Sequence, residues 1–421
     1  METISVFEHQ PLRVDGIVFK EKHRRALERF LGNNDETTFP YYSLIHQGVK
    51  FRQFVGVLCV NDLTIEVLPK TERDNNDKYY WRGKLIAMLT KIYRLDIKSP
   101  SDAPQGTKTN SAILDVFIKR FLNEVDSLLN RGLVKCYHKD EGNRNALKGK
   151  LLVSEQLRKN FIHQEQFYVR YNTYDYEHVM NCLLRQTIEV AIQATQNVYL
   201  KGRACSMLFN FPELKEVVVT PQLFDNLSFD RKTEDYRMAI KLAKLLLLHY
   251  VPYRVSKGDN ILALMFDMNK LWEEYVYIIL RHHLKDYEVR AQAVKLFWQR
   301  EDGVAKKTIR PDIVIKKDDK VIAILDTKWK CPDKTPSDGD LHQMFVYSKM
   351  FNTNKVALAF PSTKENTSSI HAHFYGEKSS CDMLFWGIGD KDNNTWSNSS
   401  IVIQNWLEEK EHNKILSPVL S

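Results

Sequence analysis

The sequence has 421 residues, of which 43% are hydrophobic and 27% charged, and these fractions are typical of folded domains rather than disordered chains. No run approaches the roughly 18 apolar residues of a membrane span, and the first residues lack the hydrophobic core of a signal peptide. We therefore expect a cytoplasmic protein that has no contact with a membrane. The length of the chain predicts two or three domains. The formal net charge of +8 favours a polyanionic partner such as DNA, although many basic proteins have none.

The first part of the chain has the pattern of a strand-rich module. Residues 51–69 predict two half-buried strands joined at Asn61-Asp62, a pair that favours turns. A helix is expected from about residue 80 to residue 93. The segment 99–110 is rich in Pro, Ser, Gly and Thr, so we expect it to be a connector.

The next segments combine a helix with a basic stretch. Apolar residues recur at three- and four-residue steps from Leu114 to Leu128, which predicts an amphipathic helix that ends at Gly132 in a left-handed cap. The polar and basic stretch 135–160 has two interpretations, a solvated surface or a contact for DNA or an acidic partner.

Helical patterns at 176–200 and 234–250 predict a layer of helices in the middle of the chain. We therefore expect three domains. They are a strand-rich N-terminal domain at 1–155, a helical connecting region at 156–250 and a C-terminal α/β domain at 251–421.

The sequence lacks the phosphate-binding loop of nucleotide hydrolases. GNRNALKGK at 142–150 has glycines and a lysine, but not the G-x-x-x-x-G-K-[ST] spacing. We expect that this chain does not hydrolyse nucleotides by itself.

The most informative segment is TIRPDIVIKKDDKVIAILDTKWK, residues 308–330. Two β-type runs flank the polar tip KKDDK, which predicts a hairpin. Asp326 and Lys328 are two residues apart in the second run, so both project from one face of the strand, while Thr327 points the other way.

Whether Asp312 joins this pair depends on the hairpin loop. Directly opposed residues share a face, so a three-residue loop at Asp318-Asp319-Lys320 would place Asp312 opposite Asp326. A two-residue loop would turn Asp312 to the wrong face. A shared site therefore requires an odd loop or a bulge.

Two neighbouring helices carry further candidates. LHQMFVYSKMF at 341–351 predicts a helix on which Gln343 and Tyr347 lie four residues apart on one face. An earlier helix has an apolar stripe flanked by Glu273 and Glu274. Glu273, nearer its edge, is either a third acidic ligand or a solvated surface residue.

The chemistry of such a cluster is phosphodiester hydrolysis. Two carboxylates beside a phosphate can hold Mg²⁺, with Mn²⁺ as the alternative, and a bound water then attacks near neutral pH. Lys328 can steer that water or offset charge that builds on the phosphate. A short D-x-K is weak by itself, because surface Asp and Lys are abundant. Here Asp326 ends the very apolar run VIAIL, which places it at the end of a buried strand.

The order of these parts resembles the RecB-like branch of PD-(D/E)xK nucleases, in which the Gln343-x-x-x-Tyr347 spacing is an additional motif. The sequence is still more similar to the McrC family, the nuclease subunits of McrBC-type restriction systems. That similarity extends through GVLCVNDLTIEVLPK (56–70), RGLVKCYHKDEGNRNALKGKL (131–151) and FDMNKLWEEYV (266–276).

The resemblance implies a restriction-endonuclease-like core with a mixed sheet flanked by helices, preceded by strand-rich and helical N-terminal modules. It implies that Asp312, Asp326 and Glu273 bind metal and that Lys328, Gln343 and Tyr347 complete the site. It also implies a partner, an McrB-like AAA+ GTPase hexamer that uses the GTP, binds the domain at 1–155 and is stimulated by it, with double-stranded DNA as substrate. The alternatives are a stand-alone RecB-like repair nuclease and a non-catalytic activator of the motor.

Overall fold

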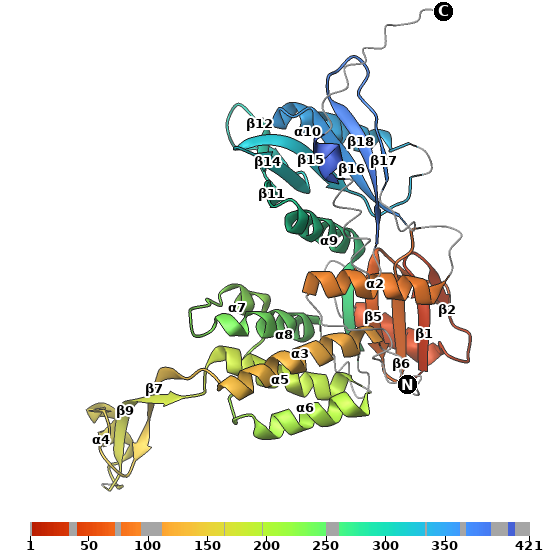
Figure 1. Ribbon diagram of the computed structural model, residues 1–421. Coiled ribbons are helices and arrows are strands. Elements are labelled where there is room, and N and C mark those ends of the chain that lie inside the picture. The colour runs from red at the N-terminus through yellow and green to blue at the C-terminus, as the bar shows by residue number, and fades with distance from the viewer. Residues whose placement is uncertain are drawn as a thin grey trace, which may run out of the picture. The chain divides into compact units, whose positions relative to one another are not determined.

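The computed structural model describes residues 2–32, 40–71, 77–93, 112–163, 165–195, 197–249, 261–332, 335–362, 368–388 and 403–408. It forms two compact units. Unit 1 consists of Met1–Thr107 and Met265–Ser421, and unit 2 of Lys108–Leu264. The chain is a mixed α/β protein with several mixed sheets, as Figure 1 shows.

These units divide the chain at other positions than the boundaries 155 and 250 expected from the sequence. The reason is a long-range pairing. The strand β10, at which the chain returns to unit 1, is the edge strand of a sheet whose other strands lie within the first 68 residues. Local periodicity does not reveal such a pairing. The three expected domains, as functional parts, stay a prediction.

The N-terminal part of unit 1 is built on a sheet of the order β1-β6-β5-β10 among the described residues. The predicted strand pair is confirmed: β5 and β6 are antiparallel and joined at Asn61-Asp62, where Asn61 has a positive φ of 55°. All six side chains of β6 are buried. The elements are β1 (Glu2–Phe7), β2 (Pro11–Arg13), α1 (Glu21–Gly32), β3 (Tyr42–Ile45), β4 (Gly48–Phe51), β5 (Phe54–Val60), β6 (Leu63–Leu68) and α2 (Lys78–Tyr93).

Unit 2 combines packed helices with a small three-stranded sheet, which we call the arm. The predicted helix end is confirmed, since α3 ends at Arg131 and Gly132 follows with a positive φ of 89°. No described helix of the chain is both long and apolar enough to span a membrane. The elements are α3 (Ala112–Arg131), β7 (Cys136–Arg144), β8 (Lys150–Leu151), α4 (Val153–Lys159), β9 (Phe167–Asp175), α5 (Val179–Ala194), α6 (Val198–Asn210), α7 (Pro221–Asp225), η2 (Glu234–Tyr236) and α8 (Arg237–His249).

The helical pattern expected at 176–200 corresponds to two helices, α5 and the start of α6. Between α5 and α6 the chain turns at Asn197, whose side chain accepts hydrogen bonds from the backbone of Tyr199 and Leu200. Such an N-cap satisfies amide groups that have no partner in the first turn of a helix, so it starts a new helix there.

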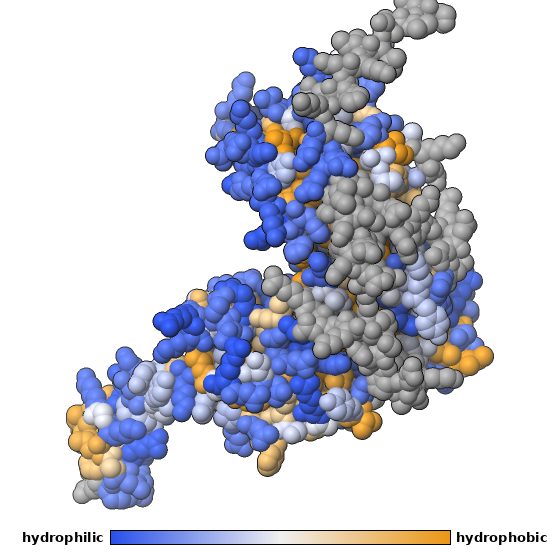
Figure 2. Space-filling model, viewed as in Figure 1, coloured by the Kyte–Doolittle hydropathy of each residue, from blue (hydrophilic) through white to orange (hydrophobic). Residues whose placement is uncertain are grey.

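The arm, at residues 136–175, holds most of the basic stretch noted in the sequence. β7 and β9 pair over nine residues, and α4 packs against β9. Several basic side chains lie over tyrosine rings, such as Lys159 over Tyr168 at 4.1 Å. Hydrophobic residues gather at the tip of the arm in Figure 2. Within the arm, Phe161 and Ile162 are 77% and 85% exposed.

The C-terminal part of unit 1 is a mixed sheet of the order β11-β14-β15-β16-β18-β17 among the described residues. β14 and β15 are antiparallel, and β15, β16 and β18 run parallel to one another. α10 contacts β15, β16 and β18, while α9 contacts β11 and β15. The elements are β10 (Ile261–Asp267), α9 (Met268–His283), β11 (Glu288–Ala291), β12 (Lys295–Gln299), β13 (Lys306–Ile309), β14 (Ile313–Lys317), β15 (Lys320–Thr327), α10 (Asp338–Phe351), β16 (Lys355–Ser362), β17 (Ser368–Ile370) and β18 (Ser380–Gly387).

Candidate active site

The hairpin β14–β15 has the bulge that a shared carboxylate site requires. Its loop is the two-residue turn Asp318-Asp319, with φ of 49° and 61°, so of the two alternatives left open by the sequence the structure has the bulge and not the odd loop. The pairing then shifts by one residue between Ile315 and Lys316, which restores the register. Beyond the shift Ile313 pairs with Leu325, so Asp312 stands opposite Asp326.

Alternation along the strands shows which face carries the site. Val314 and Ile324 belong to the core that α10 covers, together with Tyr347 of α10. Asp312 lies two residues before Val314 and Asp326 two residues after Ile324. Both therefore belong to the α10 face of the sheet.

Asp326 is a buried carboxylate, with 2% of the residue exposed. Its Oδ2 lies 2.7 Å from Lys328 Nζ, and its Oδ1 accepts a hydrogen bond of 3.3 Å from Gln343 Nε2. Burial, and then the charge of Asp312, raise the pKa of Asp326 to about 6, against the lowering effect of Lys328. A cation beside the two carboxylates would relieve this cost.

Asp312 has an unexpected partner in Thr327. Its Oδ2 accepts hydrogen bonds from the backbone N and the Oγ1 of Thr327, both at 2.7 Å. The sequence predicted that Thr327 points away from the site. The pairing ends at Ile313–Leu325, so the Asp312 side chain is not bound to the regular strand geometry and reaches Thr327.

Lys328 stands at the centre of the polar cluster. Besides Asp326, its Nζ lies 3.1 Å from Gln343 Oε1 and 3.4 Å from Asp340 Oδ1. Burial lowers the pKa of Lys328, but the carboxylates of Asp326 and Asp340 outweigh it, so the pKa is raised and the side chain stays charged.

Gln343 and Tyr347, predicted to share one face of a helix, both reach the site from α10. Gln343 Nε2 donates to Tyr347 Oη at 2.8 Å and to Asp326, while its Oε1 accepts from Lys328. Tyr347 Oη in turn donates to the carbonyl of Arg310 at 3.3 Å. The amide thus joins the second strand of the hairpin to the segment that precedes Asp312.

Of the two acidic candidates on α9, Glu273 faces the cluster. It accepts a 2.8 Å hydrogen bond from Gln292 Nε2, and the backbone N of Gln292 donates to the carbonyl of Asp312 at 2.8 Å. Burial, then the nearby charge of Asp312, raise the pKa of Glu273. Glu274 is exposed. The geometry favours Glu273 as the acidic residue beside Asp312, although no contact joins it to Asp326.

Asp340, in the first turn of α10, is a further member of the cluster that was not predicted from the sequence. Its Oδ2 accepts from Ser337 Oγ at 2.6 Å and lies 2.5 Å from Lys330 Nζ, while Oδ1 lies 3.4 Å from Lys328. One signal was present: Ser337 followed by Asp340 has the spacing of a capping box, which places that carboxylate at the end of α10 nearest the two lysines.

A second missed feature joins the site strand to the N-terminal sheet of unit 1. Trp329 Nε1 donates to Glu8 Oε1 at 2.8 Å, and the backbone N of Lys70 donates to the same oxygen at 3.0 Å. Trp329 also packs against the buried cluster of Phe7, Leu68 and Trp81, and its ring centroid lies 5.5 Å from that of Trp272. Burial raises the pKa of Glu8 to about 7. The residue next to Lys328 is therefore held from outside the hairpin.

The carboxylates of Asp312 and Asp326 fit a divalent cation in part. Oxygen donors suit Mg²⁺, which commonly binds through one or two carboxylates and completes its shell with water and phosphate oxygens. Burial, and then the charge of Asp312, raise the pKa of Asp326, so a bound cation would stabilise its charged form. In the described part of the chain, however, no group of three or more Asp, Glu, His or Cys residues is close enough to form a complete metal cage.

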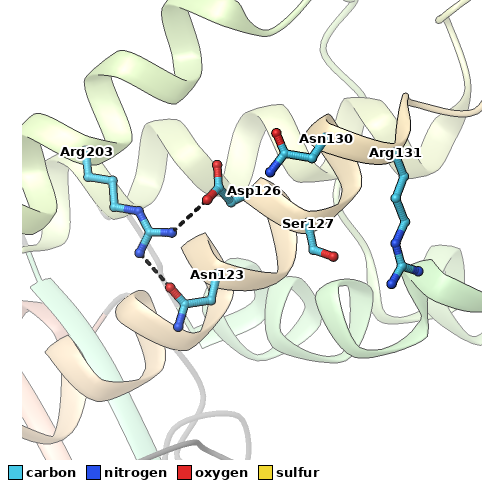
Figure 3. Close-up of a pocket in the computed structure, with 6 residues that line it drawn as sticks. All are labelled: Asn123, Asp126, Ser127, Asn130, Arg131 and Arg203. Atoms are coloured by element: carbon cyan, nitrogen blue, oxygen red, sulfur yellow. Dashed lines mark hydrogen bonds and ion pairs between the residues drawn. The ribbon is translucent and has the colours of Figure 1, made fainter.

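Unit 2 has a polar depression of about 410 Å³ between α3 and α6, shown in Figure 3. Its arginines are already paired, Arg203 with Asn123 and Asp126 and Arg131 with Asp235. It shares no residue with the carboxylate cluster. We therefore assign the candidate chemistry to the cluster and not to this depression.

Comparison with known proteins agrees with this architecture. The family model described as McrBC 5-methylcytosine restriction system component matches residues 49–361. Among solved structures, a chain of the Thermococcus gammatolerans half-complex of McrB AAA+ hexamers with bound McrC is similar over 96% of this chain and 100% of its own, with a TM-score of 0.69 and 21% identity. A chain of the Thermococcus gammatolerans McrBC complex matches 67% of this chain and 88% of its own, with a TM-score of 0.47 and 23% identity. Among curated protein sequences, none matches. The first structural likeness shows a shared fold.

Proposed function

The chain belongs to the family of McrBC 5-methylcytosine restriction system components, and on this basis we propose that it is the DNA-cleaving, McrC-type subunit of such a system. The observation that carries the proposal is the register of the hairpin, which extends from the last pair Ile313–Leu325 to Asp312 opposite Asp326, with Lys328 Nζ 2.7 Å from the Asp326 carboxylate. This is the arrangement expected of a PD-(D/E)xK nuclease core. The substrate is double-stranded DNA, and the activity is metal-dependent phosphodiester hydrolysis in the cytoplasm.

In this proposal Asp312 and Asp326 would hold the metal. Glu273 of α9 would add a further carboxylate beside Asp312. Mg²⁺, or Mn²⁺, would supply a bound water of lowered pKa and a Lewis acid for the phosphoryl oxygen. Lys328, kept charged by Asp326 and Asp340, donates to a phosphate oxygen on which negative charge develops. Gln343 fixes both Asp326 and Lys328, and Tyr347 fixes Gln343. Orientation by such partners has measurable effects on metal sites.

The proposal includes a motor partner, an McrB-like AAA+ GTPase hexamer. The Thermococcus gammatolerans structure that shares the fold is described as McrB AAA+ hexamers with bound McrC. This sequence has no G-x-x-x-x-G-K-[ST] loop, which agrees with GTP hydrolysis by the partner. We place the partner contact on the arm, at residues 136–175. The arm begins in the expected partner-binding domain at 1–155 and extends into the expected connecting region at 156–250. Exposed apolar residues such as Leu147, Phe161 and Ile162 mark a protein contact there.

The test uses the full chain with its AAA+ partner, GTP, Mg²⁺ and methylated duplex DNA. Asp326→Asn should abolish cleavage, because an amide cannot replace a charged metal ligand. The variant should still stimulate GTP hydrolysis by the partner. Asp318→Asn, in the turn of the same hairpin, is the matched control and should cut normally. Normal cleavage by Asp326→Asn would refute the site, and a chain that neither binds nor stimulates the motor would refute the partner.

A further inference from the structure

The hairpin of β12 and β13, which we call the ribbon, leaves large apolar side chains on the surface of unit 1. Leu296, Phe297 and Trp298 are 46%, 48% and 49% exposed, and Val294, just before β12, is 64% exposed. Every residue of β12 is exposed, as are three of the four residues of β13. An isolated two-stranded hairpin is at best marginally stable in water. A ribbon that is exposed to solvent on both faces therefore needs either an anchor in the same chain or a binding partner.

The anchor is at the base of the ribbon. Ile309 packs against the core below α10, and Lys295 donates to the carbonyl of Met350 at the end of α10 while its ammonium lies over the ring of Phe351. Beyond this base, about half of Phe297 and of Trp298 is exposed, at 48% and 49%. The exposed half of the ribbon is therefore held in place without being covered.

Basic side chains accompany the exposed aromatic ones. Trp298 pairs directly with Lys307 across the ribbon, and the next pair is Gln299 with Lys306. Successive pairs point to opposite faces, so each face of the ribbon carries one of these lysines. Neither lysine side chain has an ion pair or a hydrogen bond among the described residues. By contrast, the side chain of Arg300, nearer the loop, forms an ion pair with Asp302. The bulge at Phe297 adds an aromatic side chain between the pairs Leu296–Thr308 and Trp298–Lys307.

Both ends of the ribbon connect directly to the candidate active site. Before it, Gln292 bonds to Glu273 and to the carbonyl of Asp312. After it, β13 ends at Ile309, three residues before Asp312. Five strand residues span roughly 17 Å. A duplex whose scissile phosphate lay against Asp312 and Asp326 would pass within reach of the ribbon.

We propose that the ribbon binds the DNA duplex beside the scissile phosphate. A two-stranded ribbon fits the major groove of B-DNA. Lys306 and Lys307 contact phosphates, and Trp298 and Phe297 contact sugar and base surfaces that the groove exposes. DNA is favoured over a second protein surface because the unpaired charges are lysines on both faces, which match the phosphates that flank a groove on either side. This inference rests on the proposed nuclease function and assigns part of its substrate grip.

The ribbon is tested by DNA binding in the non-cleaving Asp326→Asn background, with the full chain and a fluorescein-labelled methylated duplex. Lys306→Ala with Lys307→Ala should weaken binding and reduce the slope of log Kd against log salt by about two, one for each lost phosphate contact. Phe297→Ser with Trp298→Ser should weaken binding by about tenfold or more, with little change in that slope. The lysine variant guards against a ribbon that unfolds when its aromatic residues are removed.

The matched control is Lys320→Ala with Lys378→Ala, two exposed lysines at the opposite end of β15 and in the loop before β18. The control should bind DNA like the parent. Equal weakening by the control would show a general charge effect and overturn the inference. So would unchanged DNA binding by both ribbon variants, or a loss of motor binding or of self-association instead of DNA affinity. Cleavage is then measured in chains that keep Asp326. If the wild type cleaves DNA and the ribbon variants cleave it at the same rate, only the role of the ribbon is refuted. If the wild type does not cleave DNA, the proposed function is refuted.

Discussion

The carboxylate cluster of the β14–β15 hairpin and α10 differs from the arm of unit 2 in the exposure of the groups that would make contacts. The polar groups of the cluster are largely buried and bonded to one another, whereas the arm leaves apolar side chains exposed to solvent. In the cluster, Asp326, Lys328 and Gln343 satisfy one another at distances of 2.7 to 3.3 Å, and Asp326 is almost fully buried. On the arm, Phe161 and Ile162 remain mostly exposed. Groups that carry out a reaction have to be fixed before the substrate arrives, whereas groups that recognise a protein are completed by that protein.

This difference predicts which measurement each region controls. Under the proposed function, a substitution in the cluster should change the rate of cleavage, because it removes an interaction with the reacting phosphate. A substitution on the arm should change the affinity for the proposed partner and leave the rate of cleavage unchanged.

Lys328→Ala should reduce cleavage by about a thousandfold, because the site loses the cation that offsets charge on the phosphate. Stimulation of the motor should be unchanged. Lys330→Ala is the control, since Lys330 is half-exposed and touches Asp340 but not Asp326. The measurement is single-turnover cleavage. A thousandfold loss for Lys330→Ala with little loss for Lys328→Ala would reverse the assignment.

Gln343→Ala should reduce cleavage by roughly 10- to 100-fold, the usual cost of removing a partner that orients a metal ligand. It supplies no charge, so the loss should remain well below that of Asp326→Asn. His342→Ala, exposed on the same helix, should have no effect. If Gln343→Ala abolished cleavage as completely as Asp326→Asn, Gln343 would have to contact the substrate itself.

Phe161→Ser with Ile162→Ser should weaken binding of the AAA+ partner by about tenfold or more, as expected for truncation of apolar contacts at an interface. Val198→Ser with Tyr199→Ser is the control. These two residues are also on unit 2, and they are 85% and 72% exposed. Affinity is measured by titration of labelled motor, and the free energy of unfolding should not change. A weaker motor interaction in the control alone would move the contact to α6.

Asp340→Asn should reduce cleavage severalfold and shift its pH profile. The charge of Asp340 helps to raise the pKa values of Lys328 and Asp326. Its removal should therefore move both limbs of the profile to lower pH. A purely structural loss would lower the rate without moving the limbs. Asp338→Asn, exposed in the same helical turn, is the matched control and should leave the profile in place.

Glu8→Gln should leave cleavage nearly unchanged and alter only the stability. Burial raises the pKa of Glu8 from 4.5 to about 7, so folding takes up a proton between these values. The free energy of unfolding of the wild type therefore falls as pH rises from about 4.5 to 7. Glutamine keeps the oxygen that accepts from Trp329 and Lys70 and removes the charge. It should raise the free energy of unfolding above pH 7 by up to about 3 kcal/mol. Urea unfolding at pH 5 and pH 8 measures this, and identical pH dependence in both proteins would contradict it.

Much of the candidate site could be predicted from the sequence because its signals are local. Two residues on one strand share a face by alternation, and two residues on one helix share a face at a spacing of four. Asp326 with Lys328 and Gln343 with Tyr347 follow from these rules alone. The requirement of an odd loop or a bulge was also correct, and the structure supplies the bulge.

The rest could not be predicted because it depends on contacts between distant segments. Glu8 meets Trp329 across 321 positions of sequence. Nothing in the local pattern around either residue indicates the other. The same reason applies to β10, which joins a sheet whose other strands lie within the first 68 residues. It also applies to Thr327, whose hydroxyl reaches Asp312 beyond the last pair of β14 and β15, Ile313–Leu325.

The insertion of unit 2 within unit 1 has a consequence for the order in which the ribosome makes the protein. The 157 residues from 108 to 264 leave the ribosome between the two parts of unit 1. At about 5 to 20 residues per second this takes roughly 8 to 30 s. During this time the N-terminal strands lack β10, and none of the carboxylates of the site has been synthesised. The nascent chain thus completes its arm before any residue of the candidate active site has been made.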